Sequence, residues 1–63
     1  MRSTHRKIWL ARKHGKAIRV EVVAENLETG AREPTGGGFK VDSERVLKIL
    51  SEDHGVDVEW PDE

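Results

Sequence analysis

The sequence contains no cysteine, no tyrosine and only three aromatic residues, which are Trp9, Phe39 and Trp60. Without cysteine, neither disulfides nor thiolate metal sites can stabilise the fold, and a reducing cytoplasm is the simplest location. With only 63 residues, the chain can build no more than a small hydrophobic core. We therefore expect one domain over residues 1–63, without the deep cleft that an enzyme needs.

Long hydrophobic runs are also absent. The longest apolar run behind the basic start is Ile8 to Ala11, which is much shorter than a secretory segment or a membrane span requires. We therefore expect a soluble, cytoplasmic protein that does not enter a membrane.

Positive and negative charges are unevenly distributed, although the net charge is only −1. Residues 1–20 hold seven of the 11 Lys and Arg residues and no acid, whereas residues 21–63 hold the other four and all 12 acidic residues. This asymmetry indicates an anionic partner for one end of the molecule. Alternatively, the two halves neutralise each other in the fold. We expect residues 1–5 to form a flexible basic arm and residues 61–63 a flexible acidic tail.

Two neighbouring segments alternate between apolar and polar residues, which predicts β-strands. They run from Lys7 to Ala11 and from Ile18 to Glu25, and the residues KHGK between them predict a hairpin turn. A three-residue loop, Lys13-His14-Gly15, is a common hairpin connection. It pairs Trp9 with Arg19 outside the core, and it places four aliphatic side chains on the core face: Ile8, Leu10, Ile18 and Val20.

A loop with an even number of residues sets Trp9 opposite Val20 instead, because a one-residue slip exchanges the two faces of a strand. We prefer the three-residue loop. It predicts that Trp9 is exposed and that Trp60 is buried.

The segment after the hairpin is rich in turn-forming residues. Thr29-Gly30 predicts a second reversal, and residues 31–35 predict a short strand at a sheet edge, because Pro34 lacks an amide hydrogen. The glycines at 36–38 then predict a flexible joint. They do not match a phosphate-binding P-loop, since Phe39 and Lys40 follow where Lys and Ser or Thr are required.

Residues 43–53 have the pattern of an amphipathic helix. Asp42 or Ser43 can cap its start, and Gly55 can end it. The apolar stripe of this helix, which we expect to pack on the hairpin, consists of Val46, Leu47, Ile49 and Leu50. The residues VDVEW then predict a last strand beside the first one. The expected fold is α+β: a small antiparallel sheet of three or four strands with one helix packed on one face, in the order ββ(β)αβ.

Few residues are arranged for chemistry. His5, His14 and His54 lack metal-ligand spacing, and the hydroxyl residues show no nucleophile motif. We therefore expect no enzyme activity, no metal and no cofactor.

The predicted outer face of the hairpin is the strongest candidate site. Its cations suit phosphates, and one indole ring could stack on a base or ribose. The candidate residues are Arg6, Lys7, Trp9, Arg12, Lys13, Lys16 and Arg19. This pattern favours a small protein that binds DNA or RNA in an accessory or regulatory role. Alternatively, Trp9 stacks on Arg19 in a local cation–π pair and the lysines only solvate the sheet.

A protein-interaction module without nucleic-acid binding is the second hypothesis. It could be a homodimer formed through an exposed sheet edge, or it could use its acidic half to meet a basic partner. The low net charge supports this reading, because nonspecific nucleic-acid binders normally carry a clear positive excess.

The segment from His14 to Leu50 resembles the N-terminal arm-binding, AP2-like DNA-binding domains of tyrosine-recombinase integrases. The matching pieces are HGK at 14–16, ETG at 28–30, Gly38-Phe39 and the helix from Glu44 to Leu50. In that family a three-stranded sheet lies in the DNA groove and the helix backs it. The resemblance therefore implies DNA contacts by Trp9, Arg19 and Arg32.

Overall fold

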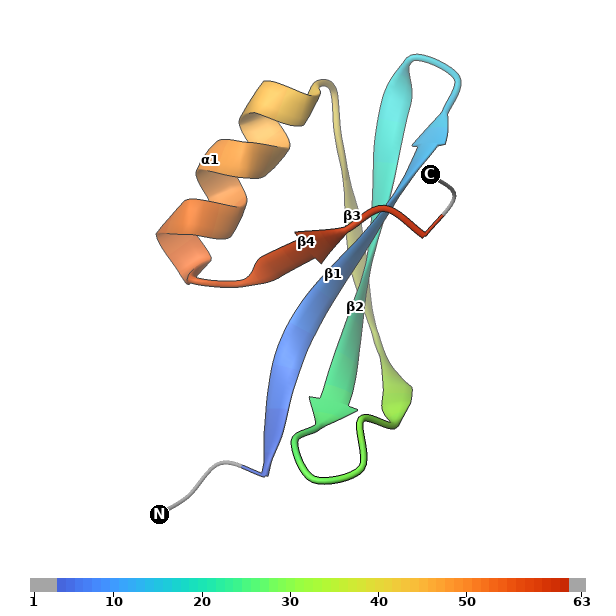
Figure 1. Ribbon diagram of the computed structural model, residues 1–63. Coiled ribbons are helices and arrows are strands. Elements are labelled where there is room, and N and C mark those ends of the chain that lie inside the picture. Colours follow the sequence, from blue (N-terminus) through green and yellow to red (C-terminus); the bar gives the residue numbers. More distant parts are fainter. Residues whose placement is uncertain (1–3, 62–63) are drawn as a thin grey trace.

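The computed structural model describes residues 4–61 as four strands and one helix. They are β1 (His5–His14), β2 (Ala17–Asn26), β3 (Arg32–Val41), α1 (Glu44–His54) and β4 (Asp57–Glu59). The strands form one sheet in the order β3-β2-β1-β4, in which β4 is parallel to β1 and the other neighbours are antiparallel (Figure 1). The predicted α+β fold with one helix is confirmed, as is the position of the last strand beside the first, but the sheet is mixed rather than antiparallel throughout, because β4 runs parallel to β1.

The hairpin between β1 and β2 closes through the two-residue turn Gly15-Lys16. His14 pairs with Ala17, so that Trp9 lies opposite Val22. Gly15 has a φ of 64°, and a glycine with positive φ at the first central position is typical of a type II′ turn, whose twist matches that of the strands. The predicted three-residue loop was wrong, and the correct loop turns Trp9 to the opposite face.

We call the sheet face that α1 covers the helix face and the opposite one the outer face. Trp9 lies on the helix face and is only 6% exposed. Its ring meets Phe39 edge-on, with centroids 4.8 Å apart, and the ring of His54 at 5.7 Å. The rest of this core consists of Ala11, Ile18, Val20, Val41 and Leu47. The prediction of an exposed Trp9 was therefore wrong, and Trp60 is half-buried rather than largely buried.

Helix α1 begins and ends within one residue of the predicted bounds. The Ser43 Oγ accepts a hydrogen bond from the Val46 amide at 3.2 Å, and Gly55 ends the helix in the left-handed conformation. Only Leu47 of the predicted apolar stripe is fully buried, and Leu50 is half-buried. Val46 and Ile49 are exposed, because the four side chains are spread around more of the helix than the side that contacts the sheet.

Strand β3 lies at the sheet edge, as its proline predicted, but it continues through all three glycines. The predicted flexible joint was wrong, because the glycine backbone pairs with β2 without needing side chains. Val22 lies opposite Gly37 and Val23 opposite Pro34, so that residues 35 and 36 form a bulge in β3. The Thr35 hydroxyl donates to the Val22 carbonyl at 2.9 Å and thereby closes the bulge.

The start of the described chain is tied to the sheet. His5 is the first residue of β1, and the Leu27 amide donates to the Thr4 carbonyl at 3.0 Å. Residues 1–3 and 62–63, which hold most of the predicted basic arm and acidic tail, lie outside the described residues. Within residues 4–61, no helix has the length and hydrophobicity that crossing a membrane requires.

Candidate anion-binding groove

Three cationic residues stand in a row across the outer face. Arg12 on β1 lies directly opposite Arg19 on β2, which in turn lies opposite Lys40 on β3. Residues that are opposite each other in neighbouring strands project from the same face, and like charges in such pairs are destabilising. The row therefore gathers positive charge on the outer face, and a bound anion would offset the part of it that no carboxylate neutralises.

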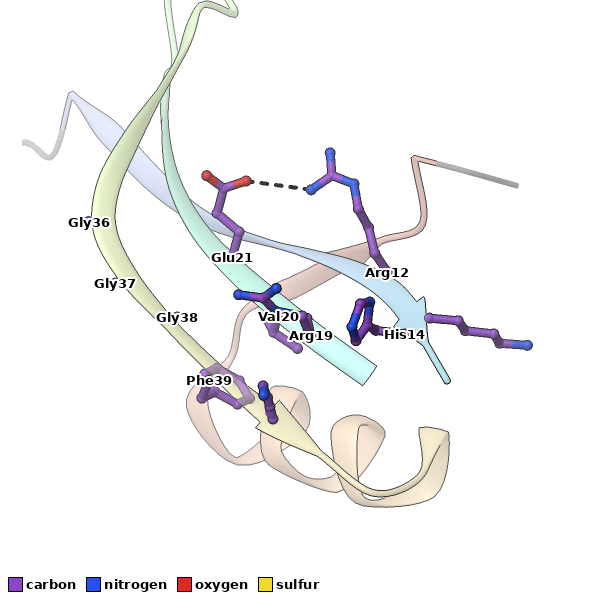
Figure 2. A pocket seen from close by; sticks show the side chains of 11 residues that line it. Arg12, His14, Arg19, Val20, Glu21, Gly36, Gly37, Gly38 and Phe39 are labelled. Atoms are coloured by element: carbon purple, nitrogen blue, oxygen red, sulfur yellow. Dashed lines mark ion pairs between the residues drawn. The ribbon is translucent and has the colours of Figure 1, made fainter. Parts of the chain in front are cut away.

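A groove of about 670 Å³ lies beside this row. Its lining consists of Arg12, Lys13, His14, Arg19, Val20, Glu21, Phe39, Lys40 and the glycines at 36–38. Figure 2 shows the glycines of β3 forming a wall without side chains, with Arg12, Arg19 and Glu21 on the neighbouring strands. The wall is also close to β2, since a Cβ on Gly38 would lie 2.7 Å from the Val20 carbonyl oxygen. Only glycine fits at this position.

The groove carries more positive than negative charge. Glu21 is its one carboxylate, and it forms an ion pair with Arg12 at 3.6 Å. Lys13 pairs with Glu44 of the helix at 3.2 Å. Among residues 4–61, no ion pair of Arg19 or Lys40 is found. These two exposed side chains are therefore the cations that remain for an external anion.

Two of the predicted contact residues instead bind carboxylates of the protein itself, at the other end of the outer face. Arg6 donates to Glu25 at 2.7 Å and to Asp57 at 2.9 Å. Arg32 donates to Glu25 at 2.9 Å and to both carboxylate oxygens of Glu59 at 2.7 Å. We call these five residues the carboxylate–arginine network.

The network shifts the pKa values of its two glutamates and its two arginines. Hydrogen bonds from Arg6 and Arg32 lower the pKa of Glu25, and the hydrogen bonds from Arg32 lower the pKa of Glu59. The hydrogen bonds to Glu59 and Glu25 raise the pKa of Arg32 above its ordinary value. Both carboxylates are therefore held in the charged form, and both arginines are occupied.

The remaining predicted residues are scattered. Trp9 is in the core, Lys7 lies opposite Ala24 on the helix face, and Lys16 is exposed in the turn. Of the predicted set, the groove brings together Arg12, Lys13 and Arg19, and it adds His14, Lys40 and the glycine wall, which the sequence interpretation missed. Lys40 directly after three glycines was a signal, but only the register of β3 places it beside Arg19.

No group of three or more potential metal ligands occurs within residues 4–61. No known family, curated protein or solved structure matches this chain. The functional interpretation therefore rests on the geometry of the outer face.

Proposed function

We propose that this protein binds the phosphate backbone of nucleic acid in the groove on its outer face. The observation that carries the proposal is the row of Arg12, Arg19 and Lys40 beside a wall of glycines. Cations in a row can each neutralise a phosphate and release its counterions. The bare wall lets a polymer approach the strand backbone without meeting side chains.

Binding of this kind has little sequence selectivity. Trp9, the ring expected to stack on bases, is in the core, and Phe39 packs against it. Contacts to phosphates fix the position of a nucleic acid but carry no sequence information themselves. The proposed role is that of an accessory or regulatory protein of the cytoplasm, acting on DNA or RNA without a catalytic step or a cofactor.

The resemblance to AP2-like domains agrees with this geometry in one respect. In those domains the sheet contacts DNA and the helix backs it, and here the cation row lies on the face opposite α1. Arg19 keeps its proposed role as a contact residue. Trp9 and Arg32 do not, because one is buried and the other is held by Glu25 and Glu59.

The test is a titration of labelled single- and double-stranded DNA and RNA, followed by fluorescence anisotropy at 50 and 200 mM salt. Two phosphate contacts, by Arg19 and Lys40, predict about a 12-fold loss of affinity for duplex DNA between these salt concentrations. Removing one contact, in Arg19→Ala or Lys40→Ala, reduces that loss to about 3.5-fold. Lys48→Ala is the matched control, because it removes one positive charge from the helix.

Two results would overturn the proposal. One is the absence of binding at tens of micromolar protein in low salt. The other is an equal weakening by Lys48→Ala and Arg19→Ala, which would show that net charge rather than the groove attracts the nucleic acid.

A further inference from the structure

A second groove lies on the helix face, between α1 and β4. Its volume is about 400 Å³, and its apolar lining consists of Leu47, Val58 and Trp60. Glu44, Arg45, Lys48 and Ser51 supply its polar lining. Trp60 and Val58 are only half-buried, so the groove exposes apolar surface that the fold leaves uncovered.

Two of the four polar side chains at this groove, Glu44 and Ser51, have partners within the protein. The Ser51 hydroxyl donates to the Lys48 carbonyl at 2.9 Å, and the Glu44 carboxylate pairs with Lys13 at 3.2 Å. Within the described part of the chain, the charged ends of Arg45 and Lys48 have no ion-pair partner. An occupant that matches the groove therefore brings apolar side chains together with negative charge.

The edge of the sheet beside the groove is also open. In the described residues, β4 pairs with β1 on one side and with no strand on the other. Val58 faces the groove, while Asp57 and Glu59 project from the outer face, where they are bound by Arg6 and Arg32. An extended peptide that pairs with such an edge presents every second side chain to one face.

The charges oppose a second copy of the chain as the occupant. In a two-fold symmetric pairing of two β4 strands, both α1 helices lie on the same side of the joined sheet. The cations Arg45 and Lys48 of both copies would then lie on one side of the joined sheet, beside the two paired β4 strands. Like-charge juxtaposition disfavours such a partner, and the same two cations favour an acidic one.

We infer that the groove between α1 and β4 binds an extended, acidic segment of another protein. The segment adds a strand beside β4 and turns aliphatic and acidic side chains toward the same face, that of α1. There its aliphatic side chains cover Val58 and Trp60, and its carboxylates meet Arg45 and Lys48. This site lies on the opposite face from the cation row and does not depend on the proposed binding of nucleic acid.

The test uses the synthetic peptide acetyl-Thr-Val-Thr-Glu-Thr-Val-Thr-Glu-Thr-amide, whose Val and Glu side chains share one face when it is extended, and isotope-labelled protein observed by NMR. We expect amide shifts in residues 44–51 and 57–60. The double variant Arg45→Glu/Lys48→Glu should bind about 5- to 30-fold more weakly, as the loss of two exposed ion pairs predicts. Lys16→Glu is the control, because that exposed side chain in the hairpin turn lines neither groove, and it should leave peptide affinity unchanged.

Strand addition is tested with two further peptides, each N-methylated on one alternate set of amides. Because alternate amides point to opposite edges of a strand, one of these peptides should lose binding and the other should keep it. Equal binding by both, equal binding of a peptide with Lys in place of Glu, or no shifts at millimolar peptide would overturn the inference. Concentration-dependent shifts at β4 without peptide would also overturn it, in favour of a homodimer.

Discussion

At the scale of single residues, Trp9 connects more of the fold than any other aromatic side chain of residues 4–61. Next to Lys7 and Arg19 in a hairpin it resembles a stacking platform, but a two-residue turn directs it into the core. It contacts Phe39 of β3 and His54 of α1, and so it joins elements that are far apart in the sequence. Its role in the structure is to hold the helix and the sheet together.

We expect Trp9→Ala to reduce the free energy of unfolding by about 3–5 kcal/mol, as is typical when a large buried aromatic side chain is removed. Since small domains have little stability to lose, most of this variant should be unfolded at 37 °C. Trp60→Ala is the control and should cost less, because Trp60 is only half-buried. Urea denaturation followed by circular dichroism measures both, and equal losses would contradict the assignment of Trp9 to the core.

At the scale of elements, the sheet is covered on both faces by different means. The helix face is covered by α1, whereas Ile8 and Val23 lie opposite each other on the outer face and are 0% and 5% exposed. Arg32 on β3 reaches Glu59 on β4, and its side chain therefore spans β2 and β1, which carry these two residues. The carboxylate–arginine network thus joins the two edge strands above a small apolar cluster.

The network predicts that stability decreases in acid. Because the pKa values of Glu25 and Glu59 are lowered in the folded state, their contribution is present above the unfolded value of about 4.3. That contribution is lost as the pH falls from there through the lowered folded pKa values.

We therefore expect the melting temperature to fall between pH 6 and pH 3, and to fall less steeply in Glu59→Gln, which lacks one of the two titrating groups. Glu33→Gln is the control, because this exposed carboxylate lies outside the network. Thermal melts at half-unit pH steps provide the measurement. Equal slopes for the two variants would show that the network does not contribute to stability.

At the scale of the whole molecule, ion pairs between the basic and acidic parts of the chain neutralise much of the charge asymmetry. Arg6 pairs with Glu25 and Asp57, and Lys13 pairs with Glu44. Of the cations in residues 4–61 without an ion pair, Arg19 and Lys40 lie on the outer face, Arg45 and Lys48 lie beside α1, and Lys7 and Lys16 are exposed outside both grooves. The molecule therefore presents two cationic surfaces of different shape, one beside bare backbone and the other beside apolar side chains.

We expect the two surfaces to be occupied independently. Because they lie on opposite faces, saturation with the acidic peptide should change the affinity for duplex DNA by less than about twofold, apart from weak long-range screening. Anisotropy titrations of labelled DNA with and without saturating peptide measure this. Loss of DNA binding on peptide addition would instead place both ligands on one surface.

The sequence by itself determined the elements that depend on local patterns. Alternation predicted β1, β2 and β4, and the cap at Ser43 with Gly55 fixed the helix to within one residue. Pro34 predicted an edge strand, because a missing amide hydrogen is a local property. Three of the predicted cations, Arg12, Lys13 and Arg19, do meet at one groove.

The tertiary structure alone decided which face each residue occupies. A change of one residue in the hairpin loop exchanged the faces and buried Trp9, and a two-residue bulge in β3 set the register that places Lys40 beside Arg19. Likewise, Arg32 is bound by Glu59, which lies 27 positions later in the chain and reaches the sheet only because β4 pairs with β1. These outcomes depend on pairing between distant segments, which no local pattern of residues specifies.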